Sequence, residues 1–415
     1  MRAGVRRASI ALALVTVAAA TAAAQSLDGY VSAVFNAFPN LDATPGEQRP
    51  VLELRPRLKV EGQTQVGSVL RLTAAGFVEG LLADRRTGST LTGGIARPQE
   101  LHAEFVWPKA DLRVGISRVA WGRLDEFLPT DVVNPLDLSR FFMEGRSEAR
   151  IANGMIRGRI VPSDRFNIEA IFVPLFRRGS FDQLDEETAP FNLAPQVPRL
   201  RDEPDRRWAN TQGGVRINAT SGRVDWSVTG YRGFESFPVY EIDPPSDAVT
   251  IRERFPRFEM VGGDFETAGG AWGVRGEVAW FRKRVLQAID QPLSGLGEVI
   301  EGGIGVDHTG ATYRIGGNVV ISWRRSLDNL PVDTTDALVV FSLDRSFARD
   351  THQLRTFAAY DTQERSVFAR AIASFAMRDN VRFELSGAWF DGTGLDLLSR
   401  LANRDFASAA FKVFF

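Results

Sequence analysis

The chain has 415 residues, with 50 basic and 51 acidic side chains, no cysteine and only three histidines. The balanced charge excludes a general polybasic surface for nucleic acid. The lack of cysteine excludes disulfides, Cys-ligated zinc and iron–sulfur clusters, so we predict no metal and no cofactor. The charged fraction of 24% excludes a polytopic helical membrane protein, but not a membrane barrel, whose interior is polar.

The N-terminal segment predicts export. Three arginines within the first seven residues precede an apolar run, Ile10–Ala20, and Ala22–Ala24 offers a small-residue cleavage site. We therefore expect a signal peptide over residues 1–24 and an outer-membrane barrel over residues 25–415. An uncleaved membrane anchor is the weaker alternative, because the apolar run is only about as long as the shortest spans.

The rest of the chain alternates apolar and polar residues in segments of about ten residues, the length that a tilted strand needs to cross a bilayer. A soluble sandwich also alternates, but its strands are usually nearer five or six residues. We predict an all-β, transmembrane antiparallel barrel of about 18 strands, with 16 as the nearest alternative. The predicted strands are 26–36, 51–61, 66–80, 97–107, 110–120, 150–161, 166–175, 209–219, 222–232, 255–266, 271–282, 298–308, 311–323, 336–348, 353–361, 365–377, 380–390 and 404–415.

The predicted connections mostly alternate between short and long, as periplasmic turns and outer loops do in outer-membrane barrels of Gram-negative bacteria. This asymmetry places both termini on the periplasmic side. The short connections include 62–65, 162–165 and 309–310. The long connections are 37–50, 81–96, 121–149, 176–208, 233–254 and 283–297.

Aromatic residues fall near the predicted strand ends, where amphipathic rings suit the membrane interfaces. The weaker alternative is that they are core aromatics of a soluble protein. The alternating final strand, with Phe411, Val413 and Phe415 on one face, resembles the signal that directs bacterial outer-membrane proteins to their insertion machinery. The predicted interface residues are Trp107, Trp272, Tyr313 and Phe415 at periplasmic ends, and Trp121, Trp208, Trp280, Trp323 and Trp389 at outer ends.

If the apolar side of each strand faces lipid, many arginines face the interior. An arginine-rich wall attracts anions and holds carboxylates or phosphates through paired hydrogen bonds. The open alternative is that these arginines only pair with interior carboxylates, such as Glu53 and Glu277. The predicted interior residues are Arg55, Arg57, Lys59, Arg71, Arg113, Arg157, Arg159, Arg216 and Arg275.

The segment 121–149 is too apolar for a loop exposed to water, and its prolines and capping residues favour tight turns. We expect this third outer loop to fold into the lumen and to set its acids opposite the arginine wall. A loop packed over the barrel mouth is the alternative. The predicted constriction residues are Asp125, Glu126, Asp131, Asn134 and Asp137, and the predicted motif or anchor residues are Trp121, at the outer rim, Gly122, Pro129 and Pro135.

The pattern Trp121-Gly122, Pro129-x-Asp131-x-x-Asn134-Pro135-x-Asp137 resembles a large family of outer-membrane barrels that is described only as a domain of unknown function. It is also similar to the alginate-export group of barrels. The resemblance implies a barrel of about eighteen strands and a transport role without an established substrate.

These observations together predict a porin-like channel, passive and arginine-lined, for small anionic or amphipathic solutes. A structural, adhesin-type or partner-binding barrel is the alternative, with loops 176–208 and 233–254 as its contact surface. A hydrolase is less favoured, because His102, His308 and His352 do not lie near an outer rim with a serine and a carboxylate in local sequence. The predicted partners are outer-membrane lipid and the insertion machinery, with a periplasmic transport partner as a further candidate.

Overall fold

The computed structural model describes residues 26–41, 50–85, 90–194, 197–243, 250–287, 294–328 and 334–415. The predicted signal peptide, residues 1–24, lies outside the described residues. No helix in the described part of the chain is both long enough and apolar enough to span a membrane.

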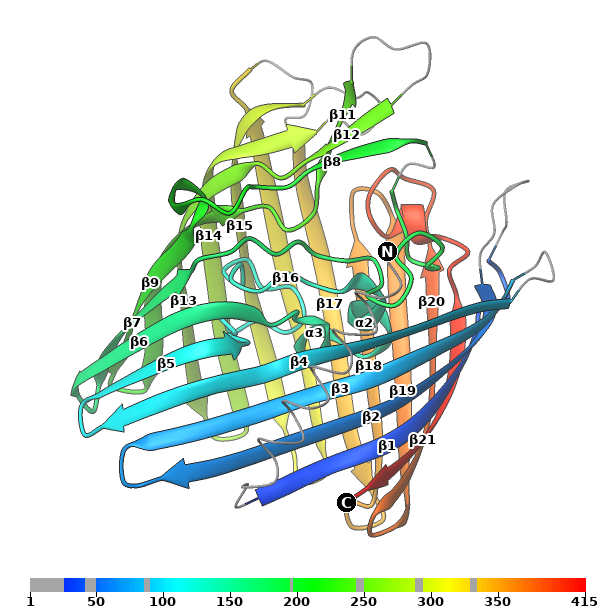
Figure 1. Cartoon of the computed structure of the whole chain (residues 1–415), viewed down its shortest axis with the longest axis horizontal. Helices are drawn as coiled ribbons and strands as arrows, with labels where there is room; N and C mark the ends of the chain where they lie inside the picture. Colours follow the sequence, from blue (N-terminus) through cyan, green and yellow to red (C-terminus); the bar gives the residue numbers. More distant parts are fainter. Residues whose placement is uncertain are drawn as a thin grey trace.

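Eighteen antiparallel strands form one closed sheet, which confirms the predicted fold class and strand number (Figure 1). Each strand of this sheet pairs with the next one along the chain, and the first, β1, pairs with the last, β21, to close the barrel. The strands are β1 (Ser26–Ala37), β2 (Pro50–Val66), β3 (Leu70–Arg85), β4 (Thr90–Trp107), β5 (Ala110–Ser117), β6 (Asn153–Ser163), β7 (Phe166–Val173), β9 (Gln212–Ser221), β10 (Val224–Phe234), β13 (Arg257–Gly269), β14 (Trp272–Gln287), β15 (Ser294–Thr309), β16 (Tyr313–Ser326), β17 (Thr334–Phe347), β18 (His352–Asp361), β19 (Ser366–Arg378), β20 (Val381–Asp391) and β21 (Phe406–Phe414).

Several segments that were predicted as connections are strand. Most of 81–96 belongs to β3 and β4, because backbone pairing continues past the glycines, as in the pair Gly80–Gly94. The turn between β2 and β3 lies at 67–69 and not at 62–65. Two outer connections also form a separate three-stranded sheet of β8 (Arg199–Asp202), β11 (Val239–Asp243) and β12 (Thr250–Arg254), in which β8 and β12 run parallel.

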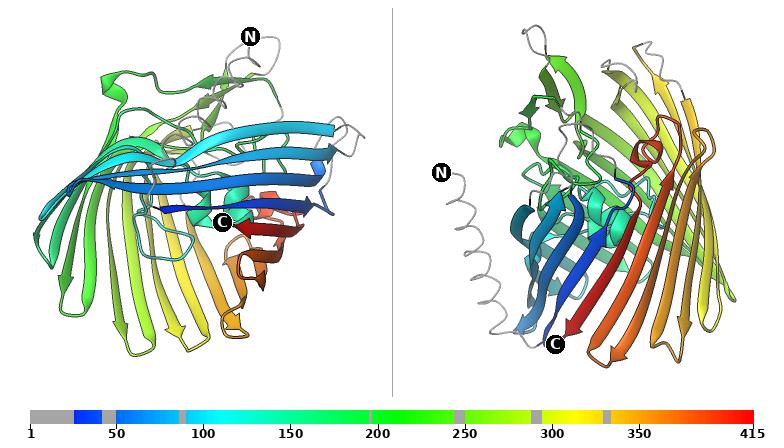
Figure 2. Two further views of the ribbon diagram at one scale, coloured as in Figure 1. Left: turned by 60° about the horizontal axis from the view of Figure 1, so that its bottom comes forward. Right: turned by 90° about the vertical axis from the view of Figure 1, so that its right-hand side faces the viewer.

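The outer face of the barrel is apolar and the inner face is polar. On β14, Val278 and Trp280 are 50% and 42% exposed, whereas Glu277 and Ala279, which alternate with them, are 4% and 0% exposed. The same alternation recurs on the other strands, and the views in Figure 2 show a continuous wall around the interior. An exposed apolar band of this kind suits the hydrocarbon core of a bilayer.

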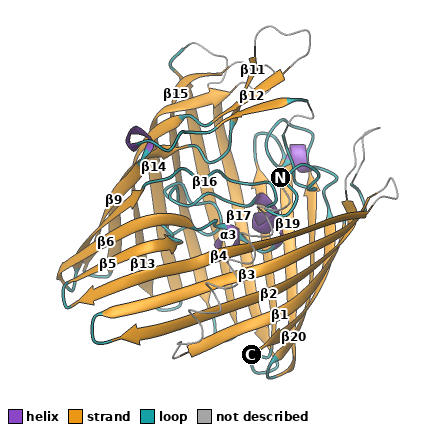
Figure 3. Ribbon diagram, in the orientation of Figure 1, coloured by secondary structure: helices purple, strands orange, loops and turns teal. Residues whose placement is uncertain are grey.

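The connection between β5 and β6, hereafter the β5–β6 loop (residues 118–152), contains two short helices, α2 (Leu138–Met143) and α3 (Arg146–Ala149) (Figure 3). Phe142 of α2 is fully buried, and its ring packs edge-to-face on Phe368 of β19 and Phe390 of β20, with both ring centroids at 5.2 Å. These contacts bring the loop against the inner face of strands that lie more than 200 positions later in the chain. Phe142 therefore joins the loop to an aromatic cluster that includes Phe368 and Phe390.

Candidate functional site

Trp121 begins the loop motif and is an interior anchor. Its side chain is only 1% exposed, its indole Nε1 donates to Glu169 Oε1 of β7 at 2.8 Å, and its ring packs edge-to-face on Tyr231. A buried indole needs a partner for its N–H group, and the carboxylate of Glu169 supplies one. The indole therefore does not face the membrane interface, so the prediction of Trp121 as an interface aromatic is wrong; its place at the outer rim stays a prediction.

Glu277 of β14 holds the loop through four hydrogen bonds. Its Oε2 accepts from the backbone N–H groups of Arg123 at 2.9 Å and Leu124 at 3.3 Å. Its Oε1 accepts from the N–H of Thr130 at 2.6 Å and from its hydroxyl at 2.8 Å. The alternation of apolar and polar residues predicts that Glu277 faces the interior. Nothing in the neighbouring sequence predicts that it binds the loop.

Gly122 lets this carboxylate approach the chain. Its φ is +89°, a conformation that glycine adopts most readily. A Cβ atom added at this position would lie 2.6 Å from both carboxylate oxygens of Glu277. The Trp-Gly pair thus has a physical reason: the indole binds one wall strand, and the glycine leaves room for a carboxylate from another.

We expect Gly122→Ala to unseat the loop, because the new methyl group meets Glu277 and the positive φ adds backbone strain of roughly 1–3 kcal/mol. Limited proteolysis of the purified protein should then cut within the loop several-fold faster than in the wild type. Gly154→Ala is the matched control, since a Cβ there meets no atom within 4 Å. Equal cleavage of both variants and the wild type would contradict this role for Gly122.

Asp131 binds the loop to itself. One of its carboxylate oxygens lies 2.8 Å from Arg146 Nε and 2.7 Å from Arg150 Nη2, and the other accepts from the backbone N–H of Trp121 at 3.3 Å. Both arginines belong to the loop, not to the barrel wall. The expected pairing of Asp131 with wall arginines is therefore not what the structure contains.

Asn134 and Pro135 join the two ends of the loop. The side-chain oxygen of Asn134 accepts from Val119 N at 2.8 Å, and its amide donates to Ile151 O at 2.9 Å. The carbonyl of Pro135 accepts from Ile151 N at 2.7 Å. Pro129 lies in the turn that presents Thr130 to Glu277. These residues fix the loop conformation and do not contact wall arginines.

Asp137 caps α2. Its carboxylate accepts from the backbone N–H of Arg140 and of Gln183, both at 3.1 Å, so it also joins the β5–β6 loop to the following outer segment. Burial raises the pKa of Asp137 to about 7, and the neighbouring carboxylate of Asp182 adds to this effect.

Two loop acids do contact the barrel wall. Asp125 lies 3.2 Å from Arg275 of β14 and 3.4 Å from Arg314 of β16. Glu126 lies 3.4 Å from Arg370 of β19. Of the predicted constriction acids, these two therefore face wall arginines.

On the opposite part of the wall, Arg57 of β2 binds Glu79 of β3 at 3.0 Å and Glu144 of the loop at 2.7 Å. Arg140 of α2 pairs with the same Glu79. Although burial favours the neutral form of Glu144, the guanidinium groups of Arg57 and Arg140 hold its pKa well below the usual range. This network attaches α2 to the first strands of the barrel.

The other predicted wall residues also lie on the inner side, mostly in ion pairs. Their role in permeation stays a prediction, because pairing with carboxylates equally suits a solvated interior. Arg55 pairs with Glu53 at 2.8 Å and Asp182 at 2.6 Å, Arg71 and Arg113 share Glu104 at 3.1 and 2.8 Å, Arg157 pairs with Glu169 and Arg159 with Asp111, both at 2.6 Å, Arg216 pairs with Asp264 at 2.7 Å, Arg275 pairs with Asp307, and Lys59 is half-buried.

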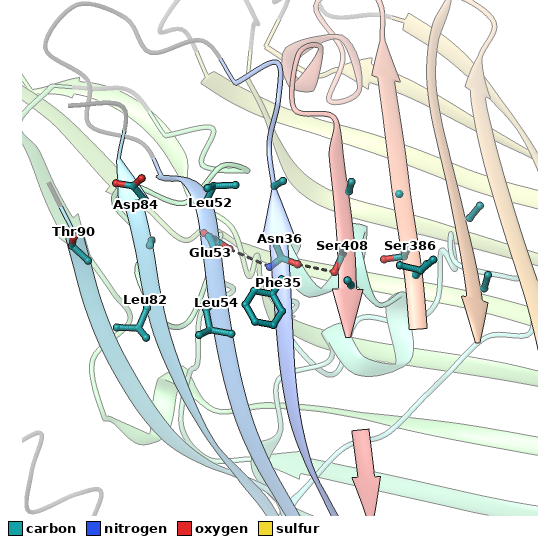
Figure 4. A pocket seen from close by; sticks show the side chains of 18 of the residues that line it. Phe35, Asn36, Leu52, Glu53, Leu54, Leu82, Asp84, Thr90, Ser386 and Ser408 are labelled. Carbon is teal, nitrogen blue, oxygen red and sulfur yellow. Dashed lines mark hydrogen bonds between the residues drawn. The ribbon is translucent and has the colours of Figure 1, made fainter. Parts of the chain in front are cut away.

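A groove of about 750 Å³ lies on the outer face, where the first strands meet the last (Figure 4). Phe35, Leu52 and Leu82 line it and are 57%, 53% and 47% exposed, so it is part of the apolar exterior. Behind this surface, Asn36 joins the seam strands by donating to Glu53 at 3.3 Å and accepting from Ser408 at 2.8 Å. In the described part of the chain, no group of three or more acidic, histidine or cysteine side chains could hold a metal ion.

The middle of the chain is similar to one known family. Residues 105–297 match the model of a family described as a protein of unknown function, DUF1302. This range includes the whole β5–β6 loop and supports the resemblance to a family of unknown function. No curated protein matches the chain.

Solved structures resemble the chain in fold. OccK8 (OprE) of Pseudomonas aeruginosa has a TM-score of 0.53 at 10% identity, over 94% of this chain and 97% of that chain. OmpF of Salmonella typhi, in complex with daunomycin, gives 0.48 at 9% identity, over 94% and 97% of the two chains. OmpT, an outer membrane protein of Vibrio cholerae, gives 0.47 at 10% identity, over 94% and 98%. The fold is that of outer-membrane β-barrels, in agreement with the apolar exterior.

Proposed function

We propose that the protein is a passive channel of the outer membrane for small anionic or amphipathic solutes, and that the β5–β6 loop constricts its interior. Diffusion through such a channel needs no cofactor. Its partners are then the membrane lipid and the insertion machinery. Any periplasmic transport partner would meet the short turns at the end opposite the long loops.

The attachment of one loop to distant parts of the wall is the observation that carries this proposal. Trp121 binds β7 through Glu169, Thr130 binds β14 through Glu277, and Glu126 binds β19 through Arg370. Elsewhere on the wall, Glu144, directly after α2, binds Arg57 of β2, and Arg140 of α2 binds Glu79 of β3. A segment held at these points narrows any passage between them, and ion pairs along it set up a transverse field.

The basic residues of the chain are almost all arginine, and this favours anions. Among the 50 basic residues only four are lysine, at positions 59, 109, 283 and 412. The planar guanidinium group of arginine offers paired donors that match carboxylate and phosphate oxygens. An interior lined by arginine therefore binds oxyanions more specifically than an interior lined by lysine would.

The proposal gives the histidines no catalytic role. His308 lies between Trp272 and Tyr313, with ring centroids at 4.7 and 5.7 Å. His102 lies on the inner face with Nδ1 at 3.2 Å from Glu100. The hydroxyl of Tyr313 lies 3.3 Å from His308 Nδ1, and both side chains are on neighbouring strands, β16 and β15.

Planar-bilayer recording of the purified protein tests the proposal. We expect stable conductance. In a salt gradient, the sign of the reversal potential should show selectivity for anions. Replacing Arg113 and Arg159 together by glutamate should move the reversal potential toward cations, because both side chains are partly exposed on the inner face. Arg349→Glu, in the turn between β17 and β18, is the control and should leave it unchanged. Absence of any conductance would contradict the proposal.

A further inference from the structure

A polar cavity of about 470 Å³ lies where the β5–β6 loop begins, beside the inner face of β6, β7, β9 and β13. Four arginines line it: Arg118 and Arg123 from the loop, Arg157 from β6 and Arg216 from β9. The cavity is separate from the aromatic cluster around α2, because the two share no lining residue.

The carboxylates around this cavity bind its arginines. Glu169 accepts from Trp121 Nε1 at 2.8 Å through one oxygen and from Arg157 Nε at 2.6 Å through the other. Asp264 of β13 has no side-chain exposure and binds Arg216 and Arg123, both at 2.7 Å. Glu266 lines the cavity with a side chain that is 45% exposed and accepts from Arg123 Nη1 at 2.8 Å. These acids hold the arginines in place.

The arginines, in contrast, have donors left over. A guanidinium group carries five N–H bonds, and Arg157 uses only its Nε in the bond to Glu169. Arg118 has Nε 3.5 Å from Glu100 and donates from Nη1 to Ser147 O at 3.4 Å, both long contacts. Nη1 of Arg216 also has no hydrogen-bond partner among the described residues, but less than 1 Å² of this atom is accessible. The cavity is therefore richer in donors than in acceptors.

We infer that this cavity is a binding site for a small organic anion, whose carboxylate or phosphate group is held by Arg157 and Arg118, the side chains of which are 15% and 22% exposed. Oxyanions supply the acceptors that the cavity lacks, and paired bonds from a guanidinium group fix their orientation. The inference rests on the proposed channel and makes it a selective one, with a saturable site beside the loop.

Isothermal titration of the detergent-purified protein tests the site without any need for conduction. The ligands are benzoate, phenyl phosphate and benzamide, the last being a neutral analogue of benzoate. We expect saturable binding of at least one of the two anions and none of benzamide. Arg157→Gln should weaken binding by about tenfold or more, equivalent to roughly 1.4 kcal/mol. Heat-modifiable migration on gels shows that each variant is folded.

Arg324→Gln is the matched control, because Arg324 also pairs with a carboxylate on the inner face, Asp336 at 2.6 Å, but lies outside the cavity. It should bind as the wild type does. The inference is overturned if folded wild-type protein binds neither anion saturably, if benzamide binds equally well, or if Arg324→Gln weakens binding as much as Arg157→Gln. Preference for benzoate or for phenyl phosphate then identifies the oxyanion.

Bilayer recording with the same ligands separates the two proposals. Benzoate or phenyl phosphate should reduce the chloride current in a saturable way, and the reduction should be lost in Arg157→Gln. Conductance without saturable anion binding would overturn the site and leave the channel standing. Saturable binding by a protein that never conducts would leave the site standing and overturn the channel.

Discussion

Deleting residues 124–138 is expected to raise single-channel conductance several-fold. The deletion removes Asp125 and Glu126, which contact wall arginines, and Thr130, which contacts Glu277. Conductance depends most strongly on the narrowest part of a pore, so loss of the loop should raise it if the loop constricts the pore as we propose. Recordings of the deletion variant and the wild type, made in the same salt, test this.

A point variant tests the same role of the loop if the deletion variant fails to fold. Glu277→Gln keeps the side-chain shape but replaces one acceptor oxygen by an NH₂ group that faces N–H donors of the loop. Each hydrogen-bonding group left unsatisfied costs roughly 1–3 kcal/mol, so the loop should detach and conductance should rise or fluctuate. Glu384→Gln is the control, because Glu384 binds Lys412 and Ser374 on the inner wall and does not contact the loop.

The opposite outcome is equally informative. Conductance that stays unchanged in the deletion variant, together with ready cleavage of the loop by proteases added to intact cells, would place the segment outside the pore. The Trp-Gly and Pro-x-Asp motif would then serve contact with a partner, not permeation.

The barrel could be predicted from the sequence because its signal is local. Alternation along each strand and the length of each segment depend only on neighbouring residues, so strand number and order were confirmed. The sheet of β8, β11 and β12 was missed because it depends on pairing between segments about 50 positions apart, as between Arg199 and Ile251. Gly93 and Gly94 are in β4, although glycine in a sequence favours a connection. They are strand because they pair with Leu81 and Gly80 of β3, and this pairing is not visible in the local sequence.

The site was predictable in its residues but not in its contacts. The loop motif indicated a structured segment, yet the partner of Gly122 is Glu277, on a strand more than 150 positions away. Alternation places Arg55 and Arg57 on the inner face but says nothing of the ion pairs that bury them. Trp121 was assigned to the membrane interface because an isolated tryptophan near a strand end has the same local pattern in either place.

Closure of the barrel gives the second large effect, because the last residue pairs with the first strand. Phe415 N donates to Gly29 O and Gly29 N donates to Phe415 O, both at 3.0 Å. A Cβ on Gly29 would lie 2.5 Å from the carbonyl oxygen of Lys59 and 2.7 Å from the Phe415 ring. The seam between β1 and β21 therefore leaves no room for a side chain at Gly29. Its last two backbone hydrogen bonds are made by Phe415.

We therefore expect deletion of Phe415, and separately Gly29→Val, to reduce the amount of heat-modifiable protein in the outer membrane several-fold. Deletion removes the exposed terminal ring and two backbone hydrogen bonds, and valine forces the two strands apart. Phe415→Tyr keeps the ring, and Gly269→Val adds side chain where nothing lies within 4 Å, so both controls should assemble normally. If Gly29→Val assembles normally while the Phe415 deletion fails, the terminal ring acts in recognition by the insertion machinery and not through the fit of the seam. Normal assembly of both variants would show that neither the final residue nor the close packing at Gly29 is needed to close the barrel.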